Sequence, residues 1–186
     1  MTFTRPSLTP KTPSLTKTAT SMLRCQIGKG QYLIPLVKVR EIIRYVTPTP
    51  VPQTAAWVNG VMNLRGRVIP VIDLAVKFSE GASVPDEWTC IVLVDVELHG
   101  ELTTLGLVTT LVSEIHDLQP QDLEPPPSVG TQIRVEFLQG LFKLDQGFAL
   151  ALDLDRILSS NEQVAVSLLA SEGASSPASS ETEPAL

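Results

Sequence analysis

Cysteine and histidine are scarce in this chain, which has only two of each. Cys25 and Cys90 each stand alone in an apolar segment, without the Cys-x-x-Cys spacing or the nearby histidine of a metal site. His99 and His116 are accompanied by no nucleophile motif and no glycine-rich phosphate loop. The sequence therefore predicts no metal site, no cofactor and no enzymatic activity, and both cysteines are interpreted as small buried apolar residues.

Long apolar runs are also missing. No run reaches the roughly 18 to 20 residues that cross a bilayer, and the first twenty residues lack the apolar stretch of a secretory signal. A net charge of -6 leaves no basic face to dominate the surface. These absences predict a cytoplasmic protein with no direct membrane insertion and no nucleic acid partner.

Composition divides the chain into a folded body and two tails. Residues 1–20 are rich in Thr, Ser and Pro and residues 161–186 in Ser, Ala and Glu, so neither segment can offset the entropy of ordering. A disordered N-terminal tail, a folded body at 21–160 and a disordered acidic C-terminal tail are therefore expected.

Within the body, short apolar and β-branched runs are separated by Gly, Pro and Asp, which indicates strands. Hairpins are predicted around Gly28–Gly30 and around the turn at His99 and Gly100. Apolar residues between Leu36 and Ile43 fall at helical spacing, which predicts one or two turns of helix after the second strand.

An internal repeat matches Val58–Phe78 with Leu138–Leu158 without a gap, and Gly60 corresponds to Gly140. Each copy reads as strand, tight turn, strand and then Asp-Leu. Two related β units in one body predict either paired small barrels or a pseudo-symmetric sandwich with a shared core.

The repeated aspartates, Asp73 and Asp153, have two possible roles. Each follows a strongly apolar strand and precedes a short helix in the predicted structure, where a carboxylate can cap free N–H groups. Two aspartates at equivalent positions of a duplicated fold can also form a catalytic dyad, which leaves a small aspartate-dependent hydrolase as a remote alternative.

A polar turn, Asn63-Leu64-Arg65-Gly66, separates two apolar strands and carries an arginine at its tip. The planar guanidinium binds carboxylates and amides with several donors at once, which suits an interface anchor. A purely solvating role for Arg65 in the hairpin is the alternative.

Three segments of this chain resemble the CheW family of bacterial chemotaxis coupling proteins in order and spacing. They are Val37–Ile43, Trp57–Gly66 and Val68–Leu74, with the proline-bearing connector between the first two. The resemblance extends more weakly through Leu105–Ile115 and Phe137–Leu158.

This resemblance implies a mainly β fold of two small five-stranded SH3-like barrels packed around a shared core, with short helices. It implies a non-catalytic adaptor that joins the cytoplasmic tip of a methyl-accepting chemoreceptor to the regulatory domain of a CheA-type histidine kinase. Such an adaptor is cytoplasmic and is recruited to membrane receptor arrays. A CheW-like adaptor of a pilus-motility or surface-sensing pathway is the alternative within the same family.

At residue level, the resemblance assigns Val39, Glu41 and Arg65 to a receptor-binding groove and places Gly60 near a kinase-facing surface. Asn63, in the same turn as Arg65, completes the predicted protein-binding set. The chain departs from the family at Thr109–Val112, where members often carry Val-Asp-x-Val.

Overall fold

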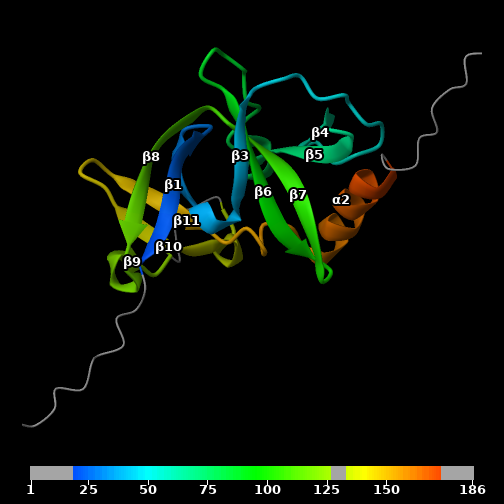
Figure 1. The fold of residues 1–186 in the computed structure, drawn as a ribbon. Coiled ribbons are helices and arrows are strands. Elements are labelled where there is room, and N and C mark those ends of the chain that lie inside the picture. Colours follow the sequence, from blue (N-terminus) through cyan, green and yellow to red (C-terminus); the bar gives the residue numbers. More distant parts are fainter. Residues whose placement is uncertain (1–18, 127–132, 173–186) are drawn as a thin grey trace, which may run out of the picture.

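The computed structural model describes residues 19–126 and 133–172, which form two β-sheets with a helix against the second (Figure 1). The tail predicted for residues 1–20 lies almost wholly outside the described residues, and the first strand begins at Thr20. Within the described ranges, no helix is long and apolar enough to span a membrane.

The first sheet has six strands in the order β8, β1, β2, β11, β10, β9. Their bounds are Thr20–Ile27 (β1), Gly30–Pro35 (β2), Leu111–Leu118 (β8), Leu123–Glu124 (β9), Leu138–Lys143 (β10) and Phe148–Leu152 (β11). Neighbouring strands are antiparallel except β11 and β2, which are parallel. The hairpin predicted at Gly28–Gly30 is present between β1 and β2.

The second sheet has five strands in the order β3, β6, β7, β5, β4. Their bounds are Val39–Arg44 (β3), Val58–Leu64 (β4), Arg67–Asp73 (β5), Cys90–Leu98 (β6) and Glu101–Thr109 (β7). Here β5 and β7 form the parallel pair. The mainly β fold is confirmed, although within the described ranges no pairing joins the outer strands of either sheet, so the barrels stay open.

The second sheet is built from one continuous run of strands, β3 to β7, and the first sheet is built from the strands before and after that run. β3 follows β2 in sequence but pairs with β6 of the second sheet, and β8 follows β7 but pairs with β1 of the first. The chain therefore passes between the sheets twice, from β2 to β3 and from β7 to β8, and the sheets pack together through apolar side chains.

The largest apolar cluster is shared by both sheets, and each sheet also has a smaller cluster on its other face. Successive strand residues alternate between these faces. Ile34 and Val94 belong to the shared cluster, whereas their neighbours Leu33 and Leu93 belong to the separate ones. Strands covered on both faces explain the nearly continuous apolar runs of the sequence.

The helix predicted between Leu36 and Ile43 is wrong in extent. A single 3-10 turn, η1, spans Leu36–Lys38, and β3 continues from there. Exposure alternates residue by residue along β3, and its β-branched side chains pair with β6. Tertiary pairing therefore overrides the apparent helical spacing.

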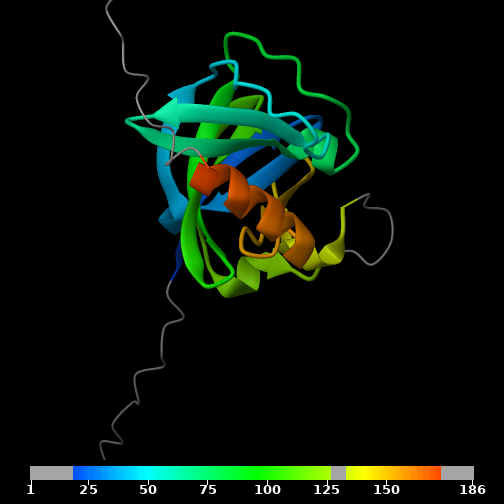
Figure 2. The ribbon, with the colours of Figure 1, turned by 90° about the vertical axis from the view of Figure 1, so that its right-hand side faces the viewer.

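The C-terminal segment predicted to be disordered from residue 161 begins with a helix instead. α2 spans Ser160–Glu172 and lies across the second sheet (Figure 2). Val166 of this helix is fully buried in the shared core. The apolar and polar residues of α2 are not clearly separated onto two faces, so the spacing of apolar residues in the sequence did not indicate a helix. Residues after 172 lie outside the described part of the chain.

The two hairpins of the predicted repeat, β4–β5 and β10–β11, have the same construction. Each contains one irregularity in its register. A Cβ at Gly60 would overlap the carbonyl oxygen of Thr49, and one at Gly140 would lie 2.9 Å from that of Glu124. In both hairpins an additional backbone segment approaches the outer strand at the glycine, which explains why the glycines correspond.

Candidate protein-binding site

The β4–β5 hairpin turns at Arg65 and Gly66. Both have positive φ, 53° and 80°, which gives the two-residue turn that matches the twist of antiparallel strands. The Gly66 N–H donates to Asn63 Oδ1 at 3.0 Å. This bond fixes the turn, while the Arg65 side chain remains 77% exposed at its tip. Asn63 thus supports the turn that presents the guanidinium.

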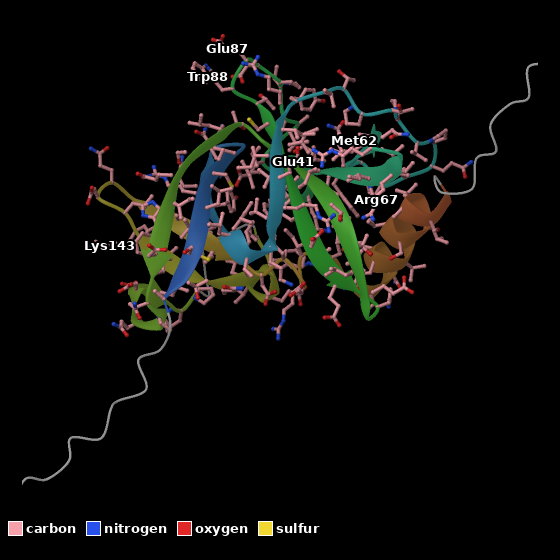
Figure 3. The ribbon with its side chains drawn as sticks, in the orientation of Figure 1. Glu41, Met62, Arg67, Glu87, Trp88 and Lys143 are labelled. Atoms are coloured by element: carbon pink, nitrogen blue, oxygen red, sulfur yellow. The ribbon has the colours of Figure 1, made fainter. Side chains whose placement is uncertain are left out.

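Glu41, on β3, meets this turn across the second sheet. Arg65 Nη2 donates to Glu41 Oε1 at 3.2 Å, although Arg65 follows the edge strand β4 and Glu41 lies on the opposite edge strand, β3. The Glu41 side chain is 33% exposed, so the pair is solvated and contributes little to folding stability. Curvature of the sheet brings together two residues that the family resemblance assigned to one groove, and Figure 3 shows Glu41 at β3.

Val39, the first residue of β3, is half-buried and packs against the shared core. Only part of its side chain is available to a partner. The outward positions of β3 are Arg40, Ile42 and Arg44. Arg40 is held by Asp95 through three contacts of 2.9 to 3.1 Å, which leaves Ile42 as the exposed apolar residue of the strand.

Gly60 is buried, and the geometry around it is structural. Its φ of 134° and the close approach of Thr49 leave no room for a side chain. Thr49 and Val61 exchange two backbone hydrogen bonds of 2.8 and 2.9 Å beside it. The absence of a side chain at Gly60 therefore allows the proline-bearing connector to pack against β4. The nearness of Gly60 to a kinase-facing surface stays a prediction.

A cluster around Lys77 was missed at the sequence level. Lys77 ends α1, which spans Leu74–Lys77, and its Nζ lies 2.6 Å from Glu162 Oε1 and 4.4 Å from the Trp57 ring centre. Glu162 also accepts from the N–H and hydroxyl of Ser159. The sequence does carry one signal for this cluster: the Ser-x-x-Glu spacing at 159–162, which is typical of a capping box at the start of a helix.

The repeated aspartates differ in role. Asp73 caps α1 as predicted, accepting from the N–H groups of Ala75 and Val76 and from Ser83. Asp153 is followed by a turn without a helix, so its predicted role as a helix cap is wrong, and its carboxylate lies 3.5 Å from Arg156. A buried Asp73 engaged by four donors is poorly suited to act as a catalytic base.

The cysteines and His116 serve no assembled metal site, because no group of three or more candidate ligands occurs within the described ranges. Cys25 is buried, and burial raises the pKa of its thiol to about 12. Cys90 is only half-buried, which corrects the expectation for that residue. His116 Nε2 lies 3.3 Å from Glu114 Oε1, but the geometry is not that of a hydrogen bond, so the two side chains are close without being hydrogen-bonded.

Comparison with known proteins extends these observations. The family model for the CheW-like domain matches residues 21–162. The chain belongs to the CheW-like domain family. It is 32% identical over 140 residues to the chemotaxis protein CheW of Klebsiella aerogenes, covering 75% of this chain and 82% of that protein. It is 26% identical over 151 residues to CheW of Rhizobium meliloti, covering 81% and 95%.

Among solved structures, the CheW-like fold matches that of the scaffolding protein TtCheW from Thermoanaerobacter tengcongensis. The TM-score is 0.69 at 25% identity, and the match covers 86% of this chain and 99% of the other. Together with the curated CheW relatives, this match identifies the chain as a chemotaxis coupling adaptor.

Proposed function

We propose that this CheW-like protein couples the cytoplasmic tips of methyl-accepting chemoreceptors to the regulatory domain of a CheA-type histidine kinase. It does so without catalytic activity, in the cytoplasm, at membrane receptor arrays. The observation that carries the proposal is the solvated Arg65–Glu41 pair, which joins two segments distant in sequence on one exposed face. Val39, Glu41, Asn63 and Arg65 form the receptor-facing set.

The geometry of Arg65 supports binding. Its guanidinium has five N–H donors, and the contact with Glu41 uses one terminal nitrogen on an otherwise exposed side chain. The turn is fixed by Asn63, so little backbone order has to be gained when a partner binds. A receptor carboxylate or amide can therefore bind Arg65 bidentately while Glu41 holds the side chain in place.

The proposal is tested by measuring the binding of a purified receptor cytoplasmic fragment to Arg65→Ala and to a matched control, Arg67→Ala. Arg67 is an exposed arginine of the same hairpin. Arg65→Ala should weaken binding by about 2 kcal/mol, roughly thirtyfold. Its melting temperature should stay close to that of the wild type, because exposed ion pairs add little stability.

Equal binding by the two variants and the wild type would remove the Arg65 face from the receptor site. Binding of the wild type only to receptors and kinases of a pilus-motility or surface-sensing array would place the same adaptor in that circuit. Binding to no receptor and no kinase of either kind would overturn the proposed function.

A further inference from the structure

A hollow of about 320 Å³ lies where the C-terminal end of α2 meets the second sheet. Its walls include Gly66 and Arg67 of the β4–β5 hairpin, Leu102 at the start of β7 and Ser171 in the last turn of α2. Figure 3 shows Arg67 near this end of α2. Because Gly66 follows Arg65 directly, a segment bound in the hollow lies beside the receptor-facing turn.

The chemistry of the hollow favours a segment with small apolar residues and carboxylates. Leu102 is 71% exposed, and the partly buried Val68 and Ala170 extend its apolar surface. Arg67 is exposed, and its side chain has no ion-pair or hydrogen-bond partner among the residues that the structure describes. Glu101 is the acidic residue of the lining, so the attraction for an anion is local to the Arg67 guanidinium. An acidic side chain next to small residues is complementary to such a surface.

Residues 173–186 have this chemistry. They lie outside the described part of the chain, and in the sequence they follow α2 directly. Glycine, alanine, serine and proline make up most of the segment, which contains Glu181 and Glu183 and no lysine or arginine. Gly173 stands directly after α2, and glycine is the residue that most readily allows a chain to reverse after a helix. The segment therefore combines small side chains with negative charge, and it starts next to a wall of the hollow.

Length and tethering favour this segment over a free partner. Glu181 is nine residues beyond Glu172, and nine residues span about 30 Å when extended. Ser171 and Arg67 line the same hollow, so this tether easily covers the distance between them. A short tether gives an attached segment an effective concentration in the millimolar range, so a contact with a millimolar dissociation constant is occupied about half of the time.

We propose that residues 173–186 bind back into this hollow, with Glu181 and Glu183 against Arg67 and the neighbouring Arg65. The bound segment occupies the surface next to the Arg65 turn and offers its carboxylates to the guanidinium of the receptor-facing set. It therefore competes with the receptor for Arg65 and lowers the apparent affinity for it. The docking depends on the hollow and its charges alone, whereas the competition rests on the proposed function.

Docking is tested in the full chain with a spin label attached through Ser180→Cys. Cys90→Ser removes the half-buried thiol, and the buried Cys25 is left in place. In NMR spectra, the label should broaden the amide signals of Gly66 and Leu102 strongly at low salt. The broadening should be weaker at high salt, because salt screens exposed ion pairs.

The matched control is the double variant Glu181→Gln and Glu183→Gln in the labelled chain, which keeps the tether and removes its charges. Broadening at the hollow should fall in this variant, and equal broadening would overturn the docking. A second control mixes the spin-labelled chain, not enriched in isotopes, with an isotope-enriched chain that carries no label. Broadening of equal size in this mixture would show that the segment of a second copy binds, which would overturn docking within one chain.

Competition is tested by measuring the affinity for the receptor cytoplasmic fragment at low salt. Without the label, the double variant should bind about twofold to fourfold more tightly than the wild type, because the fraction of chains with a free Arg65 turn rises from about a quarter or a half to nearly one. Glu87→Gln with Glu136→Gln is the charge control. It also removes two carboxylates, but neither residue lines the hollow, so its affinity should equal that of the wild type.

Arg67→Ala removes the anchor of the segment and keeps Arg65, so it should tighten receptor binding in the same range, opposite in sign to Arg65→Ala. Wild-type affinity of both the double variant and Arg67→Ala would overturn the competition and leave the proposed function intact. If the wild type bound no receptor fragment, the proposed function and the competition would fail together, while the spin-label measurement would still decide the docking.

Discussion

At the scale of single residues, two glycines of one hairpin and the two repeated aspartates contribute differently to stability. Gly60 has its backbone at φ 134° against the carbonyl of Thr49, whereas Gly66 has φ 80° with no atom near its absent Cβ. Asp73 is buried among four donors, whereas Asp153 meets one exposed arginine. The local contacts decide how much each position contributes to stability.

Gly60→Ala should therefore lower the free energy of unfolding by about 3 kcal/mol, because it adds a steric overlap to an unfavourable φ. Gly66→Ala is the matched control and should cost about 1 kcal/mol, since only its left-handed φ is penalised. Urea denaturation of both variants measures the difference. Equal losses of unfolding free energy in the two variants would show that the Thr49 segment moves away freely, and that close packing of the connector does not require a glycine at position 60.

Asp73→Ala should lower the free energy of unfolding by about 2 kcal/mol, because it removes the cap of α1 and the anchor of Ser83. Asp153→Ala should cost less than about 0.5 kcal/mol, since its pairing with Arg156 is largely exposed. Thermal denaturation compares the two variants. A larger loss at Asp153 than at Asp73 would contradict this account.

At the scale of elements, α2 is held to the body by one largely buried ion pair. The Lys77 side chain is only 5% exposed and lies between Glu162 and the rings of Trp57 and Phe137. The ring of Phe137, at the end of η3 (Val135–Phe137), connects the first sheet to this cluster. Lys77 therefore links α1, the proline-bearing connector, the first sheet and the C-terminal helix.

Glu162→Gln should lower the free energy of unfolding by about 3 kcal/mol at neutral pH, because it leaves a buried ammonium without its carboxylate. Burial raises the pKa of Glu162, but the hydrogen bonds from Lys77 and Ser159 lower it more, so the folded value lies below the usual 4.5. The stabilisation is therefore complete above pH 4.5 and is lost as pH falls through the folded pKa.

Chemical denaturation of the wild type and Glu162→Gln across this pH range measures the effect as the difference between the two curves. Glu136→Gln is the control, because the Arg134–Glu136 pair is more than half exposed and should contribute less than about 0.5 kcal/mol. A difference between wild type and Glu162→Gln that stayed constant from pH 7 to pH 3 would refute the role of Glu162.

At the scale of the whole molecule, the two passages of the chain between the sheets and the shared apolar core join the two subdomains into one body. The receptor-facing set is built on the second sheet, which the shared core fixes relative to the first sheet. A rigid body with two separate faces can hold two partners at a defined distance, and this raises the effective concentration of each partner for the other.

Titration of this protein against fixed amounts of receptor and kinase should therefore give kinase activity that rises and then falls. In excess, separate copies occupy each partner alone, and the bridge between them is lost. Phosphotransfer assays with and without receptor measure the response. An effect of equal size without receptor would contradict coupling, because it would show direct action on the kinase.

The sequence by itself determined the mainly β class, the repeated hairpins and the residues at the Arg65 turn. These features depend on local chemistry: β-branched apolar runs, turn glycines and the spacing of Asp-Leu after a strand. The Asn63 and Gly66 positions are likewise local, since one hydrogen bond between them fixes the turn. Such signals are readable because neighbours in sequence are also neighbours in space.

Tertiary structure decided the rest. β3 is a strand because it pairs with β6, which lies far from it in the sequence, and local spacing cannot show that pairing. α2 is held by Lys77 and by burial of Val166, which a weakly amphipathic segment does not reveal. Contact between Arg65 and Glu41 depends on the curvature of a whole sheet. Each of these outcomes depends on pairing between distant segments, where the free energy of burial and hydrogen bonding exceeds the local preference of the chain.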